Sequence, residues 1–509
     1  RSGDPEDDFL GNMVAEWTAR TMGQVTSLEI VPSAVVAEIL GGFDDPSSVS
    51  ALELARQAGA RYAVTGNLTR LGSSLRFEAE LVEVATGQLV VSLPPVAGPP
   101  DSLEALVERA SDAVAAGTVA TLRPGPWSLE GFSLPPTMES YQAFSVAQEA
   151  FCESSYDDAA EALYRATSTA PDWPFPYLYL VPTLQNAGRH QEIPSVLEDL
   201  EPLLPRLTGM ENLFLQWLRG GSDYEQYRAA EEFFAIDSVQ FGYALAFAAQ
   251  WINRMDRARA GVLAIDFEDR CTQNWSPNYV LAAQTLHLVG EDEAALERAL
   301  DGRRRFGLQR SLVMVEARAR AGLGDVEGVL LLADTVKNAP SSTTSILSSL
   351  LEMGLELRVH GYPEEGAALL ENARAWADQY PDMDSLRRAR LLYYLEWYEE
   401  ALPLFQTLAQ ESPGSTNLGY LALTLDALGR PAEADSVLEG FQERFPRSPY
   451  PALLAARRGD ARRAVELLQA NFDAGMIYYH NGQVNLHTDP DLAPIRDHPL
   501  FRELMRFGG

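Results

Sequence analysis

Histidine and carboxylate side chains are the groups in this sequence most able to bind a metal or move a proton. The six histidines are His190, His287, His360, His480, His487 and His498. None lies in an HExxH motif or in another pair of metal ligands at i,i+4 spacing, the arrangement that lets one helix hold zinc. His480, His487, Asp489, Asp491 and His498 gather near the end of the chain, where a metal-dependent hydrolase site is one alternative. Their irregular spacing favours turns and helix starts instead.

The chain contains a single lysine, Lys337, in the segment Val-Lys-Asn-Ala-Pro. Phosphate-binding loops, kinase nucleotide sites and pyridoxal Schiff bases each require a lysine in a defined context that Lys337 does not have. Paired carboxylates such as Asp157-Asp158 and Glu399-Glu400 stand where helices are expected to begin, because the helix dipole favours them there. We therefore predict that the chain is not an enzyme and holds no catalytic residue, no cofactor and no metal ligand.

Seven residues are candidates for contact with a partner. Aromatic and polar side chains recur every three or four residues along one expected helix, and a later helix carries a second set. They are Tyr141, Phe144, Gln148 and Phe151 in the first helix, and Thr416, Leu423 and Asp426 in the later one. A helix face of this kind can contact a peptide or a partner helix. The alternative is that a stripe at this spacing packs into the protein core.

The elements that carry these residues repeat along the last three-quarters of the chain. A small residue is followed by a large apolar residue four positions on and by proline twelve positions on. The pattern occurs as Ala159-Leu163-Pro171, Gly328-Leu332-Pro340, Ala401-Phe405-Pro413 and Ala434-Leu438-Pro446. The small residue lets two antiparallel helices approach closely, the apolar residue fills the space between them, and the proline ends the second helix.

Glycine marks the expected turn between the two helices of each repeat, where it can take the left-handed conformation at no steric cost. Such turns are predicted at Gly188, Gly290, Gly324, Gly361, Gly429 and Gly459. These motifs resemble the tetratricopeptide repeat (TPR) family, which implies stacked helix pairs with a concave groove for a protein or peptide partner. The resemblance is clearest over residues 137–171 and 386–470. One turn departs from it, because Leu395-Glu396-Trp397 stands where a glycine is expected.

The first 122 residues have a different periodicity. Strands are expected at 28–31, 62–71, 75–84 and 89–93, and helices at 9–24, 32–40, 51–58 and 102–122. We predict an α+β domain with a small mixed sheet and helices, its first strand missing, followed by an all-α TPR-like solenoid. The predicted boundaries are 1–122 for the α+β domain, 123–136 for a linker, 137–475 for the helical repeats and 476–509 for a capping tail.

Three segments of the first part resemble the TolB amino-terminal-like domain: residues 3–7 (GDPED), 58–66 (AGARYAVTG) and 84–87 (VATG). The resemblance implies a bacterial protein in which this domain precedes tetratricopeptide repeats, as in membrane-anchored Ser/Thr kinases and CadC-type regulators. It also implies a hydrophobic strand before residue 3, so we expect that strand, and possible anchor and effector segments, upstream of Arg1. An extracytoplasmic place, periplasmic or at the cell surface, follows from the same resemblance.

The formal net charge of the chain is −32. Nucleic acid and anionic membrane surfaces require clustered lysine and arginine, so we expect neither as a partner. No apolar stretch reaches the roughly 18 residues needed to span a membrane. The favoured function is a non-catalytic scaffold or sensor module that binds a protein or peptide partner in the groove. The alternative is the sensory part of a transmembrane Ser/Thr kinase or transcriptional regulator whose effector domain lies upstream of Arg1; the oligomeric state is not indicated.

Overall fold

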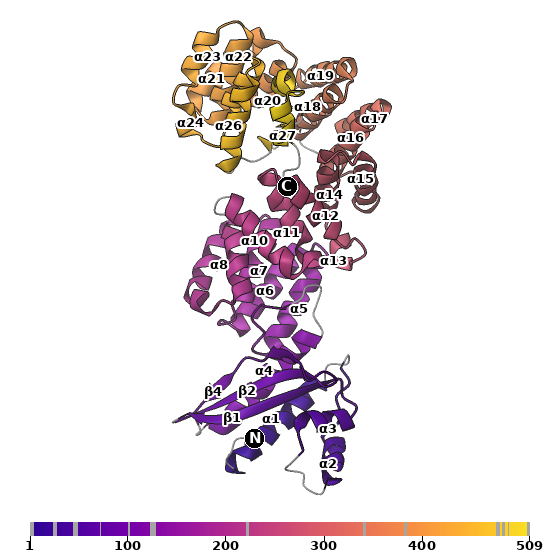
Figure 1. Cartoon of the computed structure of the whole chain (residues 1–509), viewed down its shortest axis with the longest axis vertical. Coiled ribbons are helices and arrows are strands. Elements are labelled where there is room, and N and C mark those ends of the chain that lie inside the picture. The colour runs from indigo at the N-terminus through magenta and orange to yellow at the C-terminus, as the bar shows by residue number, and fades with distance from the viewer. Residues whose placement is uncertain are drawn as a thin grey trace. The chain divides into compact units, whose positions relative to one another are not determined.

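The computed structural model describes residues 5–23, 28–43, 49–71, 73–99, 102–122, 129–219, 223–338, 343–380, 384–474, 479–480, 484–486 and 488–505. The chain forms two compact units, Arg1–Leu218 and Arg219–Gly509. The first unit contains a small sheet with helices and then helical hairpins, and helices make up most of the second (Figure 1). The predicted fold class, an α+β domain followed by an all-α solenoid, is confirmed.

The α+β part contains helices α1 (Pro5–Met22), α2 (Ser33–Gly41), α3 (Ala51–Gln57) and α4 (Leu103–Leu122), and strands β1 (Tyr62–Leu71), β2 (Ser74–Glu83), β3 (Leu89–Ser92) and β4 (Val96–Gly98). β1 pairs with β2 from Tyr62 opposite Glu83 to Leu71 opposite Ser74. β3 and β4 both pair with the other edge of β2. All pairings among these described strands are antiparallel, so the sheet is not mixed as predicted.

Strand β2 places one face of the sheet in the core. Leu75, Phe77, Ala79 and Leu81 are buried, and the side chains between them are exposed, because successive residues of a strand point to opposite faces. Helices α1 and α4 pack against each other and against the sheet, as Figure 1 shows. Together these elements enclose a hydrophobic cluster that includes Val14 of α1 and Leu106 of α4.

The strand predicted at residues 28–31 is wrong. These residues are described and form neither helix nor strand. Leu28 and Ile30 instead pack against Met22, Ala115 and Val119 of the helices α1 and α4. Both side chains therefore find apolar contacts without a strand partner. Residues 3 and 4 of the GDPED segment lie outside the described residues.

Helical hairpins follow in the first unit. Their helices are α5 (Met138–Cys152), α6 (Tyr156–Thr169), α7 (Phe175–Asn186), α8 (Ile193–Leu200) and α9 (Gly209–Arg219). The described end of the predicted linker packs onto them: the ring of Phe132 lies 4.4 Å from that of Phe175, and the amide of Ser133 donates to Glu211 Oε1 at 3.0 Å. The helices therefore hold the end of the predicted linker at both Phe132 and Ser133.

The second unit continues with α10 (Asp223–Ile236), α11 (Ser238–Trp251), α12 (Met255–Ala264), α13 (Arg270–Gln273), α14 (Ser276–Leu288), α15 (Asp292–Phe306), α16 (Arg310–Gly322), α17 (Val326–Asn338), α18 (Thr343–Val359), α19 (Pro363–Ala377), α20 (Ser385–Tyr394), α21 (Tyr398–Glu411), α22 (Ser415–Ala427), α23 (Pro431–Val437), α24 (Phe441–Arg444), α25 (Tyr450–Arg457) and α26 (Ala461–Asp473). The tail adds β5 (Tyr479–His480), β6 (Val484–Asn485), the short 3₁₀ helix η5 (Pro490–Ile495) and α27 (Pro499–Met505). None of the helices in the described ranges is long and apolar enough to cross a membrane.

The predicted turns lie where the two helices of each hairpin meet. All six predicted glycines have positive φ angles, between 72° and 93°. Where glycine is absent, another residue takes the same left-handed conformation: Ser154 at 60°, Asn253 at 58° and Glu396 at 64°. The turn after α20, which lacks the expected glycine, therefore has the same geometry as the others, although glutamate is poorly suited to it.

The small residues of the repeat pattern lie on the second helices of their hairpins, as predicted. Ala159 of α6 and Ala401 of α21 are fully buried, and so is Phe405 one turn after Ala401. Close helix approach at these positions leaves no room for a larger side chain. Pro340, which completes the pattern after α17, lies outside the described residues.

Candidate functional site

The first helices of successive hairpins in the second unit form a continuous layer. Each of α11, α14, α16, α18, α20, α22 and α25 contacts the next helix of this set. We call this set the first-helix layer. It gathers an unusual number of buried polar side chains, among them Gln250, Thr285, Glu316, Arg318, Glu352, Glu356 and Arg390. Buried polar groups of this kind require hydrogen-bond or ionic partners, so the first-helix layer is a candidate place for a site.

A chain of hydrogen bonds crosses the layer from α11 to α16. The amide of Gln250 donates to the hydroxyl of Thr285 and accepts a hydrogen bond from Gln284 Nε2 at 3.0 Å. Arg318 Nη1 in turn donates to Gln284 Oε1 at 3.3 Å. Each contact joins neighbouring first helices, so the polar side chains fix the register between hairpins as well as filling the core.

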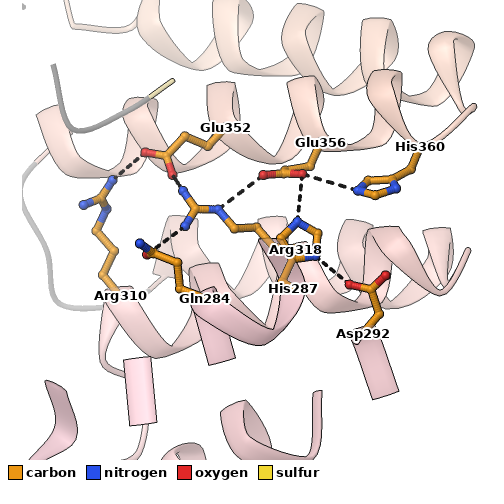
Figure 2. A network of polar contacts seen from close by, with 8 residues as sticks. All are labelled: Gln284, His287, Asp292, Arg310, Arg318, Glu352, Glu356 and His360. Atoms are coloured by element: carbon orange, nitrogen blue, oxygen red, sulfur yellow. Dashed lines mark hydrogen bonds and ion pairs between the residues drawn. The ribbon is translucent and has the colours of Figure 1, made fainter. Parts of the chain in front are cut away.

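Arg318 is the centre of this network (Figure 2). Its Nη2 donates to Glu352 Oε2 at 2.8 Å, and its Nε lies 3.3 Å from Glu356 Oε1. Arg310 approaches Glu352 from the other side, with Nη2 3.5 Å from Oε1. Helices α16 and α18 are therefore joined by two arginines and two carboxylates. Burial raises the pKa of Glu352 to about 7, although Arg318 and Arg310 oppose the rise.

Two histidines flank the far end of the network, as Figure 2 shows. His287, at the end of α14, has Nδ1 2.6 Å from Asp292 Oδ1 and Nε2 3.5 Å from Glu356 Oε2. His360, just after α18, has Nε2 3.6 Å from the same Glu356 oxygen. Side-chain exposure is 7% for His287, 3% for Glu356 and 29% for His360. Three ligand atoms from two hairpins thus face one small space.

The charges around this space shift the pKa values of His287 and Glu356. Burial alone lowers the pKa of His287, but the carboxylates of Asp292 and Glu356 outweigh it and raise that pKa to about 9. Burial would raise the pKa of Glu356, whereas His287, His360 and Arg318 hold it well below its usual range. Glu356 is therefore a carboxylate at neutral pH. Such a buried anion requires compensating positive charge.

A second polar cluster lies where the tail meets the first-helix layer. Arg457 Nη1 at the end of α25 lies 2.5 Å from Asp491 Oδ1 of η5. The hydroxyl of Tyr393, on α20, contacts both oxygens of Asp491 at 2.9 and 2.7 Å. Next to this cluster the hydroxyl of Tyr394, also on α20, lies 2.8 Å from that of Tyr420 on α22. Asp491 therefore anchors the tail to α20 and α25 together.

The rest of the tail is also packed. Leu492, Ile495 and Phe501 are buried, and η5 and α27 contact α25 and α26 respectively. Asn253, in the turn after α11, donates its Nδ2 to the carbonyl oxygen of Leu504 at 3.2 Å. The segment from Leu486 to Met505 thus makes contacts at both ends of the first-helix layer.

Four of the predicted partner-contact residues lie on α5 in the first unit. Phe144 and Gln148 are buried, and the ring of Phe144 packs on those of Trp173, Phe175 and Tyr179. Tyr141 and Phe151 are partly buried, Tyr141 against the Met22 cluster and Phe151 against Tyr156 and Tyr179. Phe144 is a packing residue, in agreement with the alternative interpretation. Contact of the four with a partner stays a prediction.

The other three lie on α22 of the first-helix layer. Leu423 is fully buried, Thr416 is partly exposed, and Asp426 accepts a hydrogen bond from Arg458 Nε at 2.8 Å. Thr416 and Asp426 are both partly exposed. Helix α5 belongs to the first unit and α22 to the second. Their role in binding stays a prediction.

Sequence reasoning missed the His287–Glu356–His360 cluster. Glu356 of α18 and His360, just after its end, stand at i,i+4 spacing, so the prediction that no such ligand pair exists was wrong. The third member comes from α14, and no local spacing connects it to α18. Two histidines of the tail are not part of this cluster. His487 lies outside the described residues, and His498 is exposed and accepts a hydrogen bond from the amide of Leu500 at 3.2 Å. His498 therefore has the helix-start role that its spacing indicated.

No protein-family model matches the chain, and no curated protein sequence matches it. Among solved structures, the chain is similar to yeast Tom70 at 12% identity and a TM-score of 0.33, covering 79% of this chain and 96% of that one. It is also similar to the TPR domain of P58(IPK) at 13% identity and a TM-score of 0.17, covering 72% of this chain and 98% of that one. Both likenesses are too weak to bear on function. The solenoid fold rests on the hairpins and turns described above.

Proposed function

We propose that this chain is a non-catalytic scaffold that binds a protein or peptide partner on the first-helix layer of its second unit. The observation that carries the proposal is the docking of the chain's own tail across this layer. Asp491 is buried between Tyr393 and Arg457, and Leu492 and Ile495 are buried beside it. The layer therefore recognises a peptide segment in cis by one carboxylate and flanking apolar side chains.

The chemistry of the layer suits such recognition. First helices that contact one another along a solenoid offer a long surface whose specificity comes from scattered side chains. A carboxylate bound by an arginine and a tyrosine hydroxyl fixes the orientation of the bound segment, and buried apolar side chains contribute affinity. We propose that a partner segment with an acidic residue followed by apolar residues competes with the tail for this surface.

Photocrosslinking in the cells that express the chain tests the proposal. A photoreactive residue at Thr416, on the first-helix layer, should give a discrete adduct with one protein. The matched control is Leu331 of α17, a second helix, where the side chain is 68% exposed. Equal adducts from both positions, or none from Thr416, would show that the layer is not the binding surface. Releasing the tail by Arg457→Met should raise the adduct yield at Thr416.

We also propose the extracytoplasmic, bacterial placement and the sensor role, with the TolB-like resemblance of residues 58–66 and 84–87 as their only support. The antiparallel hairpin β1–β2 and helix α4 are compatible with that resemblance. Fractionation of cells separates the periplasm from the cytoplasm and tests the placement. The reading frame upstream of Arg1 tests the sensor role, since a kinase or DNA-binding domain with a membrane span would support it and a bare signal peptide would end it.

A further inference from the structure

We propose that His287, Glu356 and His360 form a binding site for a divalent metal ion of the zinc class, with the ion joining α14 to α18. One ring nitrogen of each histidine and one carboxylate oxygen of Glu356 all lie within 4.8 Å of one another, and the contacts to Glu356 Oε2 are made by Nε2 of both rings. In Figure 2 both rings point toward the same carboxylate. It is the one such group of three ligands among the residues that the structure describes.

The distances fit a metal better than a direct hydrogen bond. Glu356 Oε2 lies 3.5 Å from His287 Nε2 and 3.6 Å from His360 Nε2. A charge-assisted N–H···O bond would draw these atoms to about 2.7–2.9 Å. Ligands at about 2.0–2.1 Å from a tetrahedral ion are about 3.3 Å apart, close to the observed values. Glu356 Oε2 is buried and has no hydrogen-bond partner among the described residues.

The surrounding groups orient the ligands as in known metal sites. Asp292 Oδ1 lies 2.6 Å from His287 Nδ1, so when an ion displaces the proton from Nε2 the remaining proton is held at Nδ1 and the lone pair of Nε2 faces Glu356. Arg318 Nε lies 3.3 Å from Glu356 Oε1, which leaves Oε2 for the ion. A ligating histidine typically donates its other ring N–H to a carboxylate, a backbone carbonyl or water, and here a carboxylate is in that position.

The charges of the buried cluster also favour a bound cation. Asp292 and Glu356 are the two carboxylates that face the imidazoles, whereas the guanidinium of Arg318 supplies one positive charge beside Glu356. With neutral imidazoles the cluster has one uncompensated negative charge in a buried place. Either a proton on His287 or a metal ion can supply the missing positive charge, and the 3.5 Å separation favours the ion.

Two imidazoles and one carboxylate favour zinc or a similar first-row ion over magnesium or calcium, which prefer oxygen ligands. Three protein ligands leave a fourth position open. His360 is 29% exposed, so that position is accessible to water from its side. Because α14 and α18 stand on either side of α16 in the layer, the ion would hold three successive hairpins in one arrangement.

The test is a titration of the metal-free full chain with Zn²⁺ alone, in competition with a chromogenic chelator. We expect one ion per chain, and binding weakened at least tenfold in His360→Ala, which removes a ligand whose side chain is 29% exposed. His498→Ala is the matched control, because it removes an exposed histidine outside the cluster and should leave the affinity unchanged. Equal affinity in all three chains would overturn the proposal.

Cobalt gives a second readout that does not depend on stability. Co²⁺ bound to the full chain should show the visible absorption of a four-coordinate site, and Glu356→Gln should abolish it. Asp292→Asn should weaken Zn²⁺ binding about 10–100-fold while leaving the three ligands in place. Absence of the cobalt absorption, or stoichiometric zinc that survives Glu356→Gln, would show that the cluster is an ion-pair network that holds a proton instead.

Discussion

The guanidinium of Arg457 lies 2.5 Å from the carboxylate of Asp491, and this pair fastens the tail to the first-helix layer. Asp491 is almost completely buried, and Tyr393 donates to the same carboxylate. A buried ion pair adds little net stability, but removal of one partner is costly because the other charge is left unpaired. The pair therefore controls whether the tail is docked or free.

The first prediction concerns this anchor. Arg457→Met keeps the apolar stem but removes the charge, so docking of the tail should weaken by about 3 kcal/mol. Hydrogen exchange at the backbone amides of η5 measures the change directly. The matched control is Arg502→Met, which removes an exposed ion pair with Asp497 and should cost less than about 0.5 kcal/mol. Slow exchange in η5 of the Arg457 variant would show that apolar contacts alone hold the tail.

The second prediction concerns pH. Burial raises the pKa of Glu352 to about 7 and Glu356 adds to the rise, while Arg318, Arg310 and Arg390 oppose it. Because the folded pKa lies above the usual value of 4.5, the stabilising contribution is present in acid and is lost as pH rises through about 7. Glutamine resembles the protonated carboxyl. Between pH 5 and pH 8 the free energy of unfolding of Glu352→Gln should therefore rise relative to that of the wild type by about 1 kcal/mol or more.

Denaturant unfolding of both chains at several pH values measures that difference. Glu399→Gln, on the exposed start of α21, is the control for the loss of a carboxylate outside the buried network. A pH-independent difference for Glu352→Gln would mean that Arg318 and Arg310 keep the Glu352 carboxylate ionised throughout.

The third prediction concerns the turn between α20 and α21. Glu396 has φ of 64°, and the amide of Trp397 donates to the carbonyl of Leu392 at 2.9 Å, the same closure that glycine makes in other hairpins. A side chain in this left-handed conformation costs about 1 kcal/mol, so Glu396→Gly should stabilise the second unit by about that amount. The midpoint of urea unfolding measures the gain, and Glu396→Ala should show none of it.

The fourth prediction concerns the packing of α22 against α25. A methyl group at Gly419 would overlap the ring of Tyr450, which is itself fully buried. Gly419→Ala should therefore destabilise the second unit by about 1–3 kcal/mol, the usual cost of overpacking. Gly414→Ala, at the start of the same helix, meets nothing within 4 Å and is the matched control. Equal thermal midpoints for the two variants would show that α25 can move away from α22.

Much of the fold could be predicted because its determinants are local. The glycine turns, such as Gly324, follow from the φ angle that a helix needs at its end. The alternation of apolar residues such as Leu75 and Phe77 with polar ones predicts strand β2, because successive side chains of a strand point to opposite faces. The strand at residues 28–31 was wrong, since an apolar run with no neighbouring strand to pair with can pack on helices instead.

The sequence by itself determined the hairpins, their turns and the small residues at their contacts, because these depend on residues one or two turns apart. The tertiary structure alone decided which side chains from different hairpins meet. His287 faces Glu356 and His360 only because the first helices of successive hairpins lie side by side. Arg457 meets Asp491 only because the tail returns to the layer. Contacts between distant segments leave no periodic pattern in a sequence, so the metal-site candidate and the tail anchor became visible only in three dimensions.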